Sequence, residues 1–100
     1  ALAAEARYEI ANCWYQVNKL GESEKAAFET INKSGSYDYW VTKAYILLGD
    51  IYFKQKDYFN AKATFQSIVD NTINAELKGE AQAKLNAVID EEGKSSKVNN

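Results

Sequence analysis

The sequence predicts an all-α fold, and three observations support that prediction. The chain of 100 residues contains no proline and only 5 glycines, fewer turn-forming residues than a β-rich domain of this length needs. Apolar residues recur at the three- and four-residue spacing of a helix face in five successive stretches. The connections between these stretches are short, about three to six residues, so we expect successive helices to lie antiparallel as neighbours.

The first two helices are expected at about residues 3–17 and 23–33. The second follows a turn at Gly21, and Ser23 is its expected N-cap, because a serine hydroxyl can accept a hydrogen bond from a free N–H of the first turn. The apolar side of the first helix, which we expect to face the core, carries Ile10, Cys13, Trp14 and Val17.

The third and fourth helices are expected at about residues 38–54 and 58–71. Asp38 and Asp57 stand at their starts and are the expected N-caps, since a carboxylate accepts hydrogen bonds from the first turn. The apolar residues of the third helix are Trp40, Ala44, Leu47, Leu48, Ile51 and Tyr52. Those of the fourth are Ala61, Phe65, Ile68 and Val69.

A fifth helix is expected at about residues 75–90, behind Asn74 as its cap. Its single apolar stripe consists of Leu77, Ala81, Leu85 and Val88. Beyond it the sequence is almost entirely polar, so we expect one domain over residues 1–91 and a disordered tail over residues 92–100.

The third and fourth helices repeat the first two. When residues 44–65 are laid over residues 6–28, Gly49 falls on Ala11, which is 38 positions earlier, and the aromatic residues Tyr52 and Phe53 fall on Trp14 and Tyr15. At the second helices Phe65 is placed on Phe28, which is 37 positions earlier. The alignment therefore predicts one extra residue in the first turn between helices.

The second unit resembles the tetratricopeptide repeat (TPR). The family pattern is an aromatic residue, Leu-Gly and Tyr at fixed spacing, followed by Ala and Phe. Here these slots hold Tyr45, Leu48, Gly49, Tyr52, Ala61 and Phe65. The unit is about three residues longer than the family's 34 and lacks the closing proline, and the first unit is degenerate. The small residues fit a site where two helices approach closely.

The resemblance, which covers about residues 5–73, implies a right-handed α-α superhelix of two TPR-like hairpins with a C-terminal capping helix. In such an array the first helix of each hairpin lines the concave groove. The residues it would place in a partner-binding groove are Tyr8, Asn12, Tyr15, Ile46, Asp50 and Phe53. The alternative is that Tyr15 and Phe53 pack on the next repeat.

Composition argues against nucleic-acid binding and membrane insertion. The formal net charge is −2, and the 12 basic and 14 acidic residues are interspersed, so there is no basic stripe to neutralise phosphates. No apolar run approaches the ~20 residues of a membrane-spanning helix. We therefore expect neither a nucleic-acid partner nor direct insertion of this segment into a membrane.

Residues that could carry chemistry are scarce. The chain has no histidine, the usual general base and metal ligand, and no Gly-rich phosphate loop. Its one cysteine, Cys13, is expected to be a small buried residue because it falls on Ile51 in the repeat. The acidic run 90–92 lacks the spaced oxygen ligands of a calcium loop. We expect no enzyme activity, catalytic residue, metal site or cofactor.

These observations favour a protein-interaction scaffold that binds a protein or peptide partner in the groove. The chain starts at Ala1 and has no methionine, so we expect a piece of a longer protein that is capable of self-association. A general likeness to bacterial envelope-assembly proteins built of such repeats implies the periplasm or cell envelope, through upstream sequence. The alternatives are a regulatory or oligomerising segment beside an upstream catalytic domain, and a closed five-helix bundle around a small apolar ligand.

Overall fold

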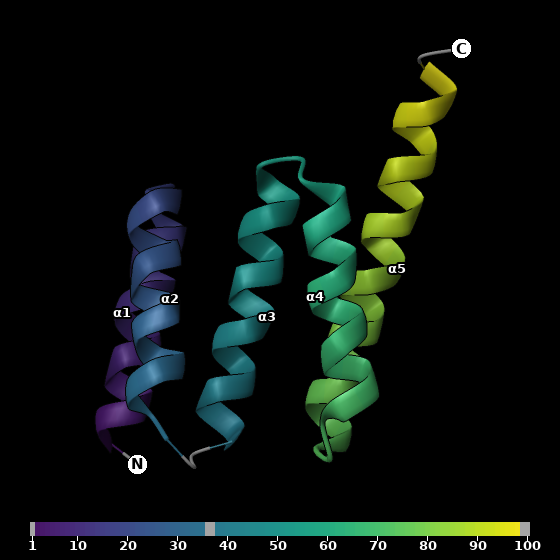
Figure 1. Cartoon of the computed structure of the whole chain (residues 1–100). Coiled ribbons are helices and arrows are strands. Elements are labelled where there is room, and N and C mark those ends of the chain that lie inside the picture. The colour runs from purple at the N-terminus through teal and green to yellow at the C-terminus, as the bar shows by residue number, and fades with distance from the viewer. Residues whose placement is uncertain (1, 36–37, 99–100) are drawn as a thin grey trace.

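The structure, a computed structural model, describes residues 2–35 and 38–98 (Figure 1). These residues form five α-helices and no strand, so the all-α prediction is confirmed. The helices are α1 (Leu2–Gln16), α2 (Leu20–Lys33), α3 (Asp38–Lys54), α4 (Tyr58–Asn71) and α5 (Ala75–Val98). Among the described residues, no helix combines the length and the apolar character needed to cross a membrane.

The helices stand in an open row of hairpins (Figure 1). Helices α1 and α2 pair, α3 lies against both, and α5 lies against α4 and more lightly against α3. Helices α1 and α5 make no contact and lie at opposite ends of the row, which measures 48 × 30 × 17 Å. The described helices therefore do not close into the five-helix bundle that was one alternative.

Two clusters of buried apolar side chains hold the row together. One joins the α1–α2 hairpin to α3 and contains Ala11, Ala27, Leu47, Leu48 and Ile51. The other joins the α3–α4 hairpin to α5 and contains Ile46, Ala61, Phe65, Ile68, Leu77, Ala81, Leu85 and Val88. Each hairpin is thus completed by the next helix along the chain, and the stripe predicted on α5 is buried as expected.

The two hairpins have the same turns, spaced 38 residues apart. The positive φ of Asn18, 64°, matches that of Lys56, 63°. The N–H of Lys19 donates to the carbonyl of Trp14 at 2.9 Å, and the equivalent bond from Asp57 to Tyr52 measures 2.8 Å. At the ends of the second helices, the N–H groups of Ser34 and Thr72, again 38 apart, donate to the fourth residue before them.

The predicted extra residue in the first turn is therefore wrong. The spacing of 38 holds in the second helices as well, so the counterpart of Phe65 is Ala27 and not Phe28. Ala27 is fully buried, whereas Phe28 is 43% exposed. Matching the two phenylalanines by type placed the alignment one residue out of register, and the backbone hydrogen bonds set the register correctly.

Ser23 does not cap a helix. Helix α2 begins three residues earlier, at Leu20, behind Lys19, which makes no side-chain cap. Ser23 lies fully buried inside α2, and its hydroxyl donates a hydrogen bond of 2.8 Å to the carbonyl oxygen of Ala11. Ser23 thus takes the small-residue position that Ala61 takes in the second hairpin.

The other caps are mostly as predicted. The carboxylate of Asp57 accepts from the N–H of Asn60 at 3.2 Å, and the side chain of Asn74 accepts from the N–H of Leu77 at 3.0 Å. Asp38, which was expected to cap α3, is instead the first residue inside that helix, and the residue before it lies outside the described part of the chain.

Helix α5 continues beyond its predicted end at residue 90. It runs to Val98, so most of the expected disordered tail is helical, and residues 99 and 100 lie outside the described part of the chain. No proline interrupts it, and two ion pairs support it: Lys94 lies 3.3 Å from Asp90 one turn away, and Glu92 pairs with Lys62 of α4. Polar composition alone therefore misplaced the end of the helix.

The apolar side predicted for the first helix faces outward instead of into the core. Ile10 and Trp14 are 55% and 38% exposed, and Cys13, which we expected to be buried, is exposed too. Ala4 and Ala11 are the buried residues of α1. Helical periodicity locates a helix, but which side is covered depends on its neighbours: α2 and α3 cover Ala11, and α2 leaves Ile10 and Trp14 at the edge of a shallow pocket.

Candidate interaction groove

The residues predicted to line a groove lie on α1 and α3, the first helices of the two hairpins. Tyr8, Asn12 and Tyr15 lie on α1 and are partly exposed. Asp50 and Phe53 lie on α3 and are also partly exposed. These five predicted side chains are therefore accessible from solvent.

Ile46, the sixth predicted groove residue, is a core residue. Only 2% of its surface is exposed, and it belongs to the cluster that α3, α4 and α5 form together. Its position on α3 is covered because α5 packs against that hairpin. The sequence spacing on α3 could not reveal this, since the spacing does not say where α5 lies.

Asp50 is part of an ion pair between helices. Both of its carboxylate oxygens accept hydrogen bonds of 2.9 Å from Nζ of Lys84 on α5. Burial raises the pKa of Asp50 above its ordinary value, and the hydrogen bond and positive charge of Lys84 oppose that rise. The acidic charge in the groove is therefore compensated from within the chain.

Tyr8 sits at the α1–α3 junction among aromatic and charged groups. Its ring centroid lies 5.6 Å from that of Trp40, and Nζ of Lys43 lies 5.5 Å from it. Lys43 also approaches Glu80 of α5 to 3.9 Å. Burial, followed by the negative charge of Glu80, raises the pKa of Tyr8 to about 12.

Tyr15 and Phe53 are each packed partly against the following unit, as in the alternative reading of the sequence. Tyr15 packs against the cluster shared with α3, and Nζ of Lys54 lies 5.0 Å from its ring. Phe53 packs against the cluster shared with α4 and α5, with its ring 6.1 Å from that of Tyr58. Burial raises the pKa of Tyr15, with a further contribution from Asp50.

Sequence reasoning missed the side chains of α5 that lie beside the predicted groove residues. Lys84 and Glu80 are one turn apart on α5 and reach toward α3, to Asp50 and Lys43 respectively. Their spacing of four residues places them on the same side of a helix. Nothing in the sequence indicates that this side faces α3, because that depends on how α5 packs. We use "the groove face" below for Tyr8, Asn12, Tyr15, Lys43, Asp50, Phe53, Glu80 and Lys84.

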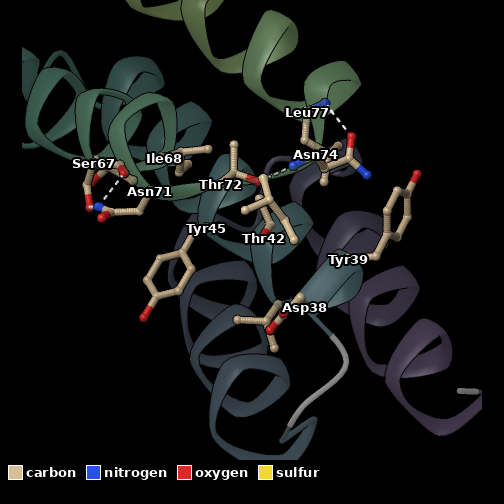
Figure 2. A pocket seen from close by; sticks show the side chains of 13 residues that line it. Asp38, Tyr39, Thr42, Tyr45, Ser67, Ile68, Asn71, Thr72, Asn74 and Leu77 are labelled. Carbon is tan, nitrogen blue, oxygen red and sulfur yellow. Dashed lines mark hydrogen bonds between the residues drawn. The ribbon is translucent and has the colours of Figure 1, made fainter.

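A concave feature lies away from the groove face. An open cavity of about 610 Å³ separates the N-terminal half of α3 from the end of α4 and its connection to α5. Figure 2 shows side chains from these segments around it, among them Tyr39, Tyr45 and Thr72. Among the described residues that line it, Asp38 alone is charged, and Ile73 is almost fully exposed. The sequence carried no signal for this cavity.

Within residues 2–35 and 38–98, no three Cys, Asp or Glu side chains cluster closely enough to hold a metal ion. Comparisons with protein-family models, with curated proteins and with solved structures find no match to this chain.

Proposed function

We propose that this chain is a TPR-like interaction module, with no enzymatic activity, that binds a protein or peptide partner on the groove face. In this proposal the two hairpins and α5 belong to a right-handed superhelix, and the groove face is its concave side. The observation that carries the proposal is the alignment of partly exposed aromatic and polar side chains from α1, α3 and α5 along one surface.

The 38-residue spacing supports this assignment. Because the two hairpins share their turns, α1 and α3 present equivalent positions: Asn12 corresponds to Asp50, and Tyr15 to Phe53. Each pair consists of a hydrogen-bonding side chain followed by an aromatic ring. Aromatic anchors supply binding energy in interfaces, and neighbouring polar groups fix the register of a bound chain.

The charges of the groove face favour a partner without high net charge. Lys84 is paired with Asp50 and Lys43 with Glu80, so the long-range field across the face is small. A partner of this kind gains affinity from apolar contact and hydrogen bonds. We therefore expect an amphipathic peptide segment with an aromatic or aliphatic anchor, bound with little dependence on salt.

Selection from a displayed random-peptide library, followed by calorimetric titration of the selected peptide, tests the proposal. Tyr15→Ala should weaken binding by at least about tenfold, because truncating an aromatic anchor removes a large share of interface energy. Phe59→Ala is the matched control, since Phe59 is an exposed aromatic residue on α4 outside the groove face. It should leave the affinity unchanged.

The result that contradicts the proposal is equally specific. If Tyr15→Ala and Asn12→Ala both bind the selected peptides as the unmodified chain does, the groove face is not the binding surface. Thermal unfolding of each variant by circular dichroism separates a loss of binding from a loss of fold.

A further inference from the structure

The outward side of α1 is an apolar surface that no described part of the chain covers. Ile10 is 55% exposed, Val17 is 63% exposed, and Cys13 lies exposed between them. Trp14 is 38% exposed and lines a shallow pocket between α1 and α2. We call Ile10, Cys13 and Trp14, together with Val17 just after the helix ends, the outer face of α1; it is separate from the groove face.

The 38-residue repeat shows what covers the same positions one unit later. Ile10 corresponds to Leu48, which is 2% exposed, and Cys13 corresponds to Ile51, which is fully buried. Leu48 and Ile51 are buried because α3 packs on the α1–α2 hairpin, where they meet Ala27 and Ala11. The residues that attach α3 to a preceding hairpin therefore have apolar counterparts on α1.

The opposite end of the row is different. Gln82 and Asn86 are exposed on α5 and hydrogen-bond to each other at 3.0 Å. The apolar stripe of α5, including Leu85 and Val88, is already buried against the α3–α4 hairpin. The exposed side of α5 thus carries one large apolar residue, Ile89, among polar ones, whereas α1 and the residue after it expose Ile10, Trp14 and Val17 together.

We propose that the outer face of α1 docks a further helix hairpin of the same 38-residue type, placed immediately before α1 in the same polypeptide. The interface would continue the one between α3 and the α1–α2 hairpin, one step along the row. The second helix of the docked hairpin presents small side chains to Ile10 and Cys13, as α2 presents Ala27 to α3.

Glu9 on α1 sets a further requirement for the docked hairpin. Glu9 corresponds to Leu47, which is buried on the α1–α2 hairpin. Docking would remove the Glu9 carboxylate from water, which is unfavourable unless a positive charge or hydrogen-bond donor meets it. The docked hairpin therefore carries a basic or hydrogen-bonding side chain opposite Glu9.

Alkylation of the single thiol tests the proposal directly. A copy of residues 1–38 carrying Cys13→Ser is fused before Ala1, so that the original Cys13 remains the only thiol in the extended chain. Iodoacetamide should alkylate Cys13 at least about tenfold more slowly in the extended chain than in the 100-residue chain, because its counterpart Ile51 is fully buried.

Matched substitutions in the original α1 make the test specific. Ile10→Lys should restore rapid alkylation in the extended chain, whereas Gln16→Lys should not, since its counterpart Lys54 stays exposed on α3. Glu9→Leu should raise the melting temperature of the extended chain more than that of the 100-residue chain, because only docking buries that position.

Three outcomes overturn the proposal. Cys13 could react equally fast in both chains, or the added hairpin could contribute no helical signal in circular dichroism. The third is dimerisation of the 100-residue chain in sedimentation velocity that Ile10→Lys abolishes and Gln16→Lys does not, which would assign the surface to a second copy. Each outcome leaves the peptide-binding test of the groove face unaffected.

Discussion

The ring of Phe65 on α4 lies directly against the backbone of Gly49 on α3. A Cβ atom placed on Gly49 would lie 2.5 Å from Cζ and 2.9 Å from Cδ1 of that ring, distances that real contacts do not show. Both residues are buried, so the ring has little room to move aside. This pair sets how closely the two helices of the second hairpin approach.

Gly49→Ala should therefore destabilise the fold by about 1–3 kcal/mol, because the added methyl group overpacks the hairpin. The intrinsic preference of alanine for helices acts in the opposite direction by up to about 1 kcal/mol. Gly79→Ala on α5 is the matched control: a Cβ there meets nothing within 4 Å, so it should stabilise the chain. Urea denaturation measures both, and a gain in stability for Gly49→Ala would refute the contact.

The buried hydroxyl of Ser23 is expected to contribute to the first hairpin. Ser23→Ala removes its hydrogen bond to the carbonyl of Ala11 and should lower the free energy of unfolding by about 0.5–1.5 kcal/mol. Ser23→Val should cost more, because the added volume separates α1 from α2. Thermal and urea unfolding give the ranking, and equal stability of Ser23→Ala and the unmodified chain would show that only the size of the residue matters.

The partly buried carboxylate of Asp50, which pairs with Lys84, predicts that the stability of the fold changes with pH in a defined direction. Because the pKa of Asp50 is raised in the folded chain, mainly by burial, the folded chain holds that proton more tightly than the unfolded chain. The resulting stabilisation is present below the ordinary pKa of 3.8 and is lost as the pH rises through the folded pKa. Asp50→Asn should therefore gain stability relative to the unmodified chain as the pH rises from about 4 to 7.

Urea denaturation of the two chains at both pH values measures this difference. The opposite trend, a variant that becomes relatively weaker with rising pH, would show that attraction to Lys84 outweighs the cost of burying the carboxylate.

The raised pKa of Tyr8 predicts a second pH dependence of folding stability, at alkaline pH. Its pKa of about 12 in the folded chain exceeds the ordinary 10.0, so the unfolded chain loses this proton first. The stability that Tyr8 contributes is complete below pH 10 and disappears as the pH rises to about 12. Tyr8→Phe should therefore lose less stability between pH 9 and about 11 than the unmodified chain. Guanidinium unfolding at the two pH values measures the effect, with Tyr45→Phe at an exposed site of α3 as the control.

The sequence by itself determined the helices and much of the second hairpin. The periodicity near Leu47, Leu48 and Ile51 arises from contacts within one helix and its immediate surroundings, so it places α3 at residues 38–54 correctly. The small size of Gly49 likewise indicates a close approach before its partner is known. These properties depend on residues that are close together in the chain, so the sequence suffices to predict them.

The tertiary structure alone decided which side of each helix is covered. Ile46 and Ile10 are equally apolar, yet α5 buries the first and nothing described covers the second. Ser23 became a buried hydrogen-bond donor because α1 lies against it, and Asp50 became half of an ion pair because α5 brings Lys84 to it. Such outcomes depend on contacts between residues far apart in the chain, and no spacing within one helix encodes them.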